Sequence, residues 1–158
     1  MPRQFPMTQA GRTALEEELR QLLTRRGEVA EMLGAAISQG DLSENAEYHE
    51  GKYQQAIVEG RVAELETVLA NAVIVEPTDE HTGAVALFST VTVLDLEYDE
   101  EIEYRLVPLF EADYKLGRIS VESPLGEGLL GRSEGEEVAI TTPGGITRLR
   151  ILAVRLGQ

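Results

Sequence analysis

Two long stretches of the chain repeat apolar residues at the spacing of a coiled coil. In the first stretch, from about Thr8 to Ile37, the apolar positions step by three, four or seven residues: Leu15, Leu19, Leu22, Val29, Leu33 and Ala36. In the second, from about Ser43 to Ala72, they step by four and three in turn: Val58, Val62, Leu65, Leu69 and Ala72. A period close to 3.5 residues gathers these side chains on one helix face. The pattern predicts two helices that pack along an apolar seam, the first with Thr8 as its N-cap.

The residues between the two predicted helices, Gly40 to Tyr48, read Gly-Asp-Leu-Ser-Glu-Asn-Ala-Glu-Tyr. A turn there makes an antiparallel hairpin with this segment at its tip. A helix of roughly 30 residues that rises about 1.5 Å per residue is a rod of about 45 Å. The seam continues towards the tip only through Gln55, Gly51 and Tyr48, so we expect the hairpin to be held more loosely there.

Four glycines also fall inside the two predicted helices. Each costs about 1 kcal/mol relative to alanine, and close approach of the two helices is the simplest reason for them. These glycines are Gly27, Gly34, Gly51 and Gly60.

After about residue 76 the helical period gives way to alternation and turn signals, which predicts a second domain. We therefore expect a helical hairpin over residues 1–76 and a separate domain over residues 77–158. Ser123 followed by Pro124 is an N-cap and first-turn signal for one short helix. The expected fold class is α+β, with a small antiparallel sheet beside that helix. The predicted strands are Thr90–Leu96, Ile102–Val107, Ile119–Val121, Glu137–Thr141 and Ile146–Arg155.

Composition limits the classes of function. The chain has no apolar run long enough for a membrane helix and no visible signal peptide, so we expect a cytoplasmic protein with no membrane partner. Cysteine is absent, which excludes disulfides and thiolate chemistry. The formal net charge is −14, from 14 basic and 28 acidic residues. Nucleic-acid phosphates repel such a chain, so any contact with nucleic acid needs a partner protein that supplies the attraction.

The acidic pair Asp41 and Glu44 at the predicted tip has two interpretations. An acidic residue three positions after Asp41, at a helix start, fits a capping box, and Ser43 is another possible N-cap. Alternatively, the two carboxylates belong to a metal site that is incomplete in this chain. Mg²⁺ often takes one or two carboxylates and fills its other positions with water or phosphate. From spacing alone both interpretations stay open.

The tip segment resembles that of the Gre family, the bacterial transcript cleavage factors. The resemblance covers nearly the whole chain in the same order, and its combination of short motifs is specific. Besides Gly40–Tyr48, the matching segments are Glu59-Gly60-Arg61, Thr90-Val91-Thr92-Val93, Glu111-Ala112-Asp113, Ile119-Ser120, Ser123-Pro124, Gly128-Leu129-Leu130-Gly131 and Thr142-Pro143-Gly144-Gly145. The resemblance implies an N-terminal coiled-coil hairpin and a C-terminal domain of FKBP-like fold.

The resemblance also implies a mechanism. Such proteins dock on RNA polymerase beside its secondary channel, and their hairpin enters the channel. Residues matching Asp41 and Glu44 help to hold a second Mg²⁺, shared with the polymerase active site, and the backtracked RNA is cleaved near its 3′ end. Asp41 is the expected metal ligand, with Glu44 as a second ligand or a water-orienting base. We expect the tip to be shaped by Leu42, Ser43, Asn45, Glu47 and Tyr48.

Two further surfaces have both a family role and a plainer one. Arg25, Arg26 and Lys52 are candidates for contact with the extruded RNA, or they belong to a solvated face with ion pairs to nearby glutamates. Arg26 falls on the seam, which weakens its claim. The segment with Ser120, Glu122, Ser123 and Pro124 resembles the loop that grips the polymerase, although a helix cap explains Ser123 and Pro124 equally well.

The sequence departs from the family pattern in the second domain. Ser89 stands where a glycine is common, and residues 107–110 are more apolar than expected, which leaves the local loop shape open. His49 is expected to be a surface residue. The expected protein is a monomeric accessory factor that is not itself an enzyme. The alternatives are a Gre homologue that blocks the same channel without cleavage, and an unrelated coiled-coil interaction protein.

Overall fold

The structure is a computed structural model that describes residues 3–40, 45–77 and 83–156. The chain divides into two compact units, Met1–Phe5 with Gln9–Val73 and Pro6–Thr8 with Ile74–Gln158. The domain boundary expected between residues 76 and 77 stays a prediction. Within the ranges just given, no helix has both the length and the apolar character that a membrane-spanning helix needs.

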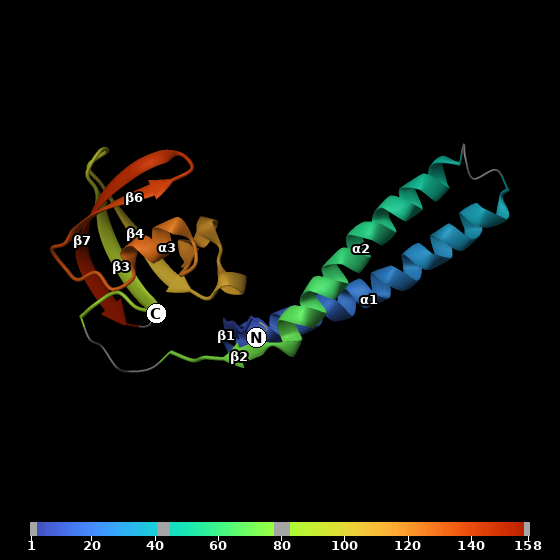
Figure 1. The fold of residues 1–158 in the computed structure, drawn as a ribbon, viewed down its shortest axis with the longest axis horizontal. Helices are drawn as coiled ribbons and strands as arrows, with labels where there is room; N and C mark the ends of the chain where they lie inside the picture. The colour runs from blue at the N-terminus through green and yellow to red at the C-terminus, as the bar shows by residue number, and fades with distance from the viewer. Residues whose placement is uncertain (1–2, 41–44, 78–82, 157–158) are drawn as a thin grey trace. The chain divides into compact units, whose positions relative to one another are not determined.

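The first unit is a hairpin of two long helices. Helix α1 spans Gln9–Ser38 and helix α2 spans Ala46–Ala70, and the two run antiparallel and side by side (Figure 1). The predicted helical hairpin is thereby confirmed. A short sheet of β1 (Phe5–Met7) and β2 (Ala72–Ile74) pairs the chain segments just before α1 and just after α2.

Both ends of α2 differ from the prediction. Asn45 has an extended backbone (φ −87°, ψ 103°) and is the N-cap, so the helix begins at Ala46 and not near Ser43. The side chain of Asn45 accepts a hydrogen bond from the backbone N–H of Tyr48, which is how an N-cap satisfies an otherwise unpaired donor. At the other end Asn71 is the C-cap, and Ala72 belongs to β2 and not to the helix.

The apolar seam is buried at most of the positions that the heptad pattern predicts, but Leu19, Leu22 and Ala72 are only half-buried. Leu69 is also only half-buried, and its neighbour Val68 is the buried residue at this point of the helix. Arg26, which falls in the gap of the α1 pattern, keeps an exposed side chain. Each buried aliphatic side chain contributes about 1.5–3 kcal/mol relative to the exposed state. The buried seam residues are Leu15, Val29, Leu33, Ala36, Gly51, Val58, Val62, Leu65 and Val68.

Gly51 lies where the two helices approach closely. A Cβ atom at this position would meet Cδ2 of Leu33 at 2.7 Å, which is closer than real Cβ contacts allow. The expected close approach is confirmed here. It is wrong for Gly27, Gly34 and Gly60, since a Cβ atom there would have no neighbour within 4 Å among the described residues.

The second unit is built on a five-stranded sheet with the order β5-β4-β3-β7-β6. Strand β3 (Ser89–Asp95) pairs antiparallel with β4 (Glu100–Val107) and β7 (Gly145–Leu156), and β6 (Glu137–Thr142) pairs antiparallel with β7. Strand β5 (Arg118–Ser120) runs parallel to β4, so the sheet is mixed and the expectation of a purely antiparallel sheet is wrong at this edge.

The parallel edge follows from the connection between β4 and β5. A parallel pair needs a crossover in place of a tight turn. Residues 108–117 supply it with two single-turn 3₁₀ helices, η1 (Leu109–Glu111) and η2 (Tyr114–Leu116). Helix α3 (Pro124–Leu129) follows β5 and packs on the sheet, and its predicted N-cap Ser123 accepts a hydrogen bond from the N–H of Gly126 (3.0 Å). The predicted α+β class is confirmed. The core is formed by Val85, Val91, Val93, Leu106, Ile119, Leu129, Val138, Ile140, Leu149, Ile151 and Val154.

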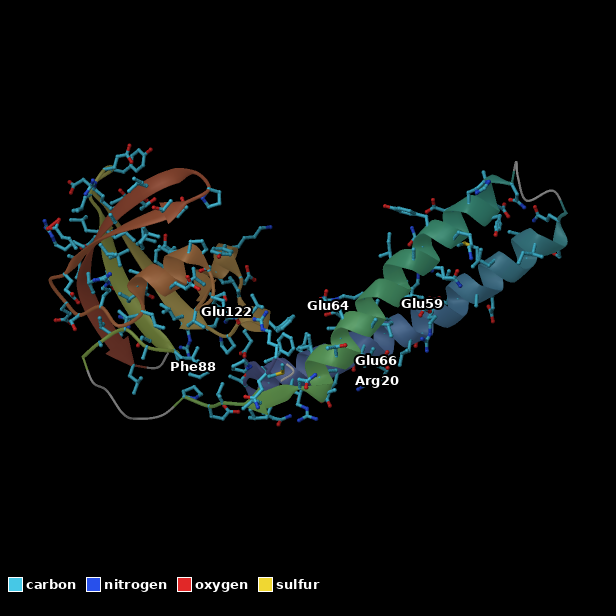
Figure 2. The ribbon with its side chains drawn as sticks, viewed as in Figure 1. Arg20, Glu59, Glu64, Glu66, Phe88 and Glu122 are labelled. Carbon is cyan, nitrogen blue, oxygen red and sulfur yellow. The ribbon has the colours of Figure 1, made fainter. Side chains whose placement is uncertain are left out.

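Ser89 stands where the family commonly has a glycine, and the residue before it, Phe88, has a strained backbone. Phe88, labelled in Figure 2, has a φ of 72°, in the left-handed region that a residue other than glycine rarely adopts. Its side chain is buried, and its N–H donates to the carbonyl of Leu106 (2.8 Å). The hydroxyl of Ser89 accepts from the N–H of Ala86 (2.9 Å), which closes the turn before β3.

Candidate functional site

The predicted chemical residues of the tip, Asp41 and Glu44, lie outside the described residues, as do Leu42 and Ser43. Their described neighbours are Gly40 and Asn45, which follow α1 and precede α2. Gly40 has a φ of 103°, a conformation that glycine adopts without the penalty of a Cβ atom. Its N–H donates to the carbonyl of Ile37 (3.2 Å). The chain therefore leaves α1 through a residue for which glycine is required.

Asn45 joins the two helices at this end of the hairpin. Its Oδ1 accepts a hydrogen bond from the N–H of Tyr48 in α2 (3.1 Å). Its Nδ2 donates to the carbonyl of Ala36 in α1 (2.9 Å). Ala36 is itself fully buried on the seam. A single amide group therefore caps one helix and holds the end of the other.

The other described tip residues lie in the first turn of α2. Glu47 is exposed, and its carboxylate accepts a long hydrogen bond from Nε2 of Gln39 (3.5 Å). The half-buried ring of Tyr48 meets the ring of His49 edge-on, with centroids 5.6 Å apart and planes at 67°. His49 is exposed, as predicted for a surface residue.

The structure separates the three predicted RNA-contact residues by their partners. Arg25 pairs with Glu28 in the same helix (3.8 Å), and Arg26 pairs with Glu59 of α2 (3.7 Å). Lys52 instead donates from Nζ to Oε1 of Gln55 (3.2 Å). Of the lysine and arginine residues that the structure describes in α1 and α2, Lys52 is the one without an ion pair. Its ammonium group is therefore the hairpin cation with the least compensated charge.

Sequence reasoning missed a second link between the helices. Arg61 binds Glu18 with two hydrogen bonds, Nε to Oε2 (2.7 Å) and Nη2 to Oε1 (2.9 Å). The hydrogen bond from Arg61 lowers the pKa of the Glu18 carboxyl, and partial burial opposes this effect. Arg61 also pairs with Glu64 (labelled in Figure 2) of its own helix. The only signal in the sequence is that the two residues have opposite charges. They can be recognised as partners only when the register of the two helices is known.

In the second unit, the four predicted contact residues divide into internal and exposed side chains. The hydroxyl of Ser120, a buried residue, accepts from the N–H of Glu122 (3.0 Å). The hydroxyl of Ser123 donates to the carbonyl of Ser120 (2.7 Å) and caps α3. Glu122 (Figure 2) and Pro124 are exposed. The serines therefore build the loop, while Glu122 and Pro124 form its outer surface.

No self-contained metal centre occurs in the part of the chain that the structure describes. Over residues 3–40, 45–77 and 83–156, no three histidine, aspartate or glutamate side chains gather closely enough to hold a metal ion.

Known proteins match nearly the whole length of this chain. The family described as "Transcription elongation factor, N-terminal" matches residues 5–74, and "Transcription elongation factor, GreA/GreB, C-term" matches residues 80–156. The transcription elongation factor GreA of Clostridium perfringens is 46% identical over 150 residues, which are 94% of this chain and 95% of that protein. GreA of Bacillus cytotoxicus is 49% identical over 152 residues, 96% of each chain. Among solved structures, the GreA factor homolog 1 (Gfh1) protein of Thermus thermophilus is 28% identical with a TM-score of 0.47, over 97% of this chain and 99% of that one.

Proposed function

Because the chain belongs to the GreA/GreB family of transcription elongation factors, we propose that it binds RNA polymerase and stimulates Mg²⁺-dependent cleavage of backtracked RNA. In this proposal the α1–α2 hairpin enters the secondary channel of the polymerase and brings its tip to the active site. The protein acts in the cytoplasm as a monomer, and it is an accessory factor because the polymerase supplies the rest of the catalytic centre. Cleavage near the RNA 3′ end would return an arrested complex to synthesis.

The observation that carries this proposal is the construction of the hairpin end. Helix α1 has 30 residues, which at about 1.5 Å per residue is a rod of about 45 Å. Gly40 follows this rod and Asn45 caps its partner, so the four residues that contain Asp41 and Glu44 connect the helices at the turn. Two acidic residues in the connection between two long antiparallel helices suit a probe that must reach a buried centre.

The donor chemistry of the tip fits Mg²⁺. Carboxylate oxygens are the ligands that this hard cation prefers, and Mg²⁺ commonly takes only one or two of them from a protein. Asp41 would be the metal ligand, and Glu44 a second ligand or the base that orients the attacking water. When bound there, the ion would supply an activated water for hydrolysis of the phosphodiester. Two carboxylates do not complete the coordination shell, so the site would be shared with the polymerase.

Charge supports the need for a protein partner. The formal charge of −14 repels RNA, and Arg25 and Arg26 are compensated by glutamates. Lys52 is therefore the best candidate on the hairpin for contact with the extruded RNA. In the second unit, the loop from Ser120 to Pro124 would dock at the rim of the secondary channel through its outer residues, Glu122 and Pro124.

A stalled, backtracked elongation complex with labelled RNA tests the proposal. The protein is added with Mg²⁺, and the release of short 3′ fragments and binding to the polymerase are followed in the same samples. Fragment release faster than the polymerase alone supports the proposal. Binding without faster release would mean that the protein blocks the channel, and absence of binding would contradict the proposal as a whole.

A further inference from the structure

The described ends of the tip segment are linked by one side chain. Asn45 donates to the carbonyl of Ala36 (2.9 Å) and accepts from the N–H of Tyr48 (3.1 Å). We propose that Asn45 is a positioning residue, whose amide sets the spacing between the end of α1 and the start of α2, and that the rate of cleavage depends on this spacing. This inference rests on the proposed function, because it assigns a role in the same reaction.

The chemistry of the two contacts explains why an amide is needed. Asp and Ser cap a helix about as well as Asn does, so capping alone does not require it. An ionised Asp has no donor for the Ala36 carbonyl, and Ser offers only a hydroxyl on a shorter side chain, whereas Asn carries N–H donors beside its capping oxygen. The orientation of the amide is fixed as well, because Tyr48 presents a donor and Ala36 an acceptor. Both halves of the amide are therefore used, one for each helix.

The position of the accepting carbonyl makes the contact effective. Ala36 is near the end of α1, where the last four carbonyls have no partner further along the helix. Its oxygen accepts from the N–H of Gln39 (3.2 Å) and from Asn45. The Asn45 bond therefore fixes α1 two residues before its last residue, Ser38, and fixes α2 at its N-cap.

The other links between the helices are weaker at this end or lie farther from it. The hydrogen bond from Gln39 to Glu47 is 3.5 Å long and exposed. The contact of Gly51 with Leu33 is apolar, so it restrains the distance between the helices but involves no hydrogen bond. The ion pair of Arg61 with Glu18 is far along the hairpin. Over residues 3–40 and 45–77, Asn45 thus makes the short, part-buried hydrogen bond between α1 and α2 nearest the tip.

A shift of about 1 Å in a catalytic group can cost on the order of a hundredfold in rate. Loss of the Asn45–Ala36 bond leaves α2 capped but releases the spacing of the two helix ends. The effect should therefore fall on the rate of cleavage at saturating protein and on its Mg²⁺ requirement. Binding to the polymerase and the thermal unfolding midpoint should stay unchanged.

The test compares three variants at Asn45 with matched controls. Asn45→Asp keeps an N-cap oxygen and loses the donor to Ala36, Asn45→Ser keeps an N-cap oxygen and replaces the amide donor by a hydroxyl on a shorter side chain, and Asn45→Ala loses both. Asn71 provides the control, since its Nδ2 donates to the carbonyl of Thr67 (2.9 Å) within α2, at the end of α2 away from the tip. Asn71→Ser and Asn71→Asp therefore remove a similar amide donor without touching the tip.

We measure 3′-fragment release from a backtracked complex at saturating protein across a Mg²⁺ series, with polymerase binding and the unfolding midpoint of each variant. The expected result is a rate about tenfold lower and a higher half-saturating Mg²⁺ concentration for Asn45→Ser and Asn45→Asp, with unchanged binding and midpoint. The Asn71 variants should behave as the parent.

Four results would overturn the inference. If Asn45→Ser and Asn45→Asp cleave at the parent rate and only Asn45→Ala is slow, the residue is a helix cap alone. If the slow variants also unfold at lower temperature, the role is structural. If the parent itself releases no fragments, the proposed function is contradicted, and the positioning role falls with it. A cleaving parent beside equally active Asn45 variants contradicts the positioning role only.

Discussion

The guanidinium of Arg61 in α2 donates two hydrogen bonds, of 2.7 and 2.9 Å, to the carboxylate of Glu18 in α1. The two residues are 43 positions apart in the chain, so the pair links the two arms of the hairpin. The planar guanidinium matches a carboxylate in this two-pronged geometry, which lysine cannot reproduce. The pair therefore helps to set the register in which the two apolar stripes meet.

The first prediction concerns the pH dependence of this pair. Arg61 lowers the folded-state pKa of Glu18 below its ordinary value of 4.5. Stability from a lowered pKa is present above the unfolded-state pKa and is lost as pH falls through the folded-state pKa. Both side chains are more than a third exposed, 35% for Arg61 and 38% for Glu18. We therefore expect a coupling of only about 0.5–1 kcal/mol.

A double-mutant cycle with Glu18→Gln and Arg61→Gln measures this coupling from urea unfolding. The coupling should be present at about pH 7 and should be lost as the pH falls through the folded-state pKa of Glu18, where the carboxyl becomes protonated. Arg12 and Glu16, a pair within one helix turn (3.6 Å), supply the control cycle. A Glu18–Arg61 coupling that persists in acid would contradict the assignment of the pair as an ion pair.

The second prediction compares two glycines of α2. Replacing an exposed helix glycine by alanine stabilises the folded state by about 1 kcal/mol, and Gly60 has open space for the added methyl group. At Gly51 the same methyl group meets Leu33 at 2.7 Å. Gly60→Ala should raise the thermal midpoint, whereas Gly51→Ala should lose that gain and separate the helices locally. Equal stabilisation by both substitutions would show that the helices are not in close contact at Gly51.

A third prediction follows from the backbone of Phe88. Phe88→Ala and Phe88→Gly both remove a buried ring and should destabilise the second unit by about 3–5 kcal/mol. A φ of 72° costs an L-residue about 1–2 kcal/mol relative to glycine. The glycine variant should therefore be the more stable of the two by about 1 kcal/mol, the reverse of the usual order. Chemical unfolding of both variants decides the matter, and an alanine variant of higher stability would refute the left-handed assignment.

The fourth prediction distinguishes a residue that stabilises the loop before α3 from a residue of that loop that is proposed to contact the polymerase. Ser123→Ala removes the N-cap of α3 and should cost about 1 kcal/mol of stability. Glu122→Ala removes an exposed side chain and should leave stability within about 0.5 kcal/mol. If the loop docks on the polymerase, Glu122→Ala should nevertheless weaken binding several-fold. Thermal unfolding and competition binding on the same preparations test this, and a Glu122→Ala variant with parental affinity would remove Glu122 from the proposed contact.

The long helices could be predicted because apolar residues recur at helical spacing through several turns of each helix. The start of α2 could not be fixed, since both Ser43 and Asn45 are good N-cap residues and the sequence does not choose between them. Arg26 sits on the heptad seam, but its long side chain reaches from the seam to solvent and to Glu59. Heptad position alone does not decide the burial of such a residue.

The parallel edge of the sheet and the hairpin links needed three-dimensional information. The short run at β5 has the composition of a strand, but composition does not encode its direction, which is set by the crossover through residues 108–117. The partner of Asn45 is a backbone carbonyl, and a carbonyl has no sequence signature. The roles of Asp41 and Glu44 came from a motif, and they stay predictions because both residues lie outside the described ranges.

The fifth prediction addresses these two carboxylates. Asp41→Asn and Glu44→Gln keep the shape of each side chain but remove the charge that a Mg²⁺ ligand provides. Glu50→Gln is the matched control, since Glu50 is an exposed acid of α2 that is assigned neither to the metal nor to the shape of the tip. The variants should bind the polymerase as the parent does, because docking is assigned to the second unit.

The most direct measurement is therefore the rate of 3′-fragment release from a backtracked elongation complex, at saturating protein, for the parent and these three variants. We predict that Asp41→Asn and Glu44→Gln each slow release by about a hundredfold or more, while Glu50→Gln stays within about twofold of the parent. Release at the parental rate by the Asp41 and Glu44 variants, with equal binding, would contradict the claim that the tip carboxylates complete the metal site.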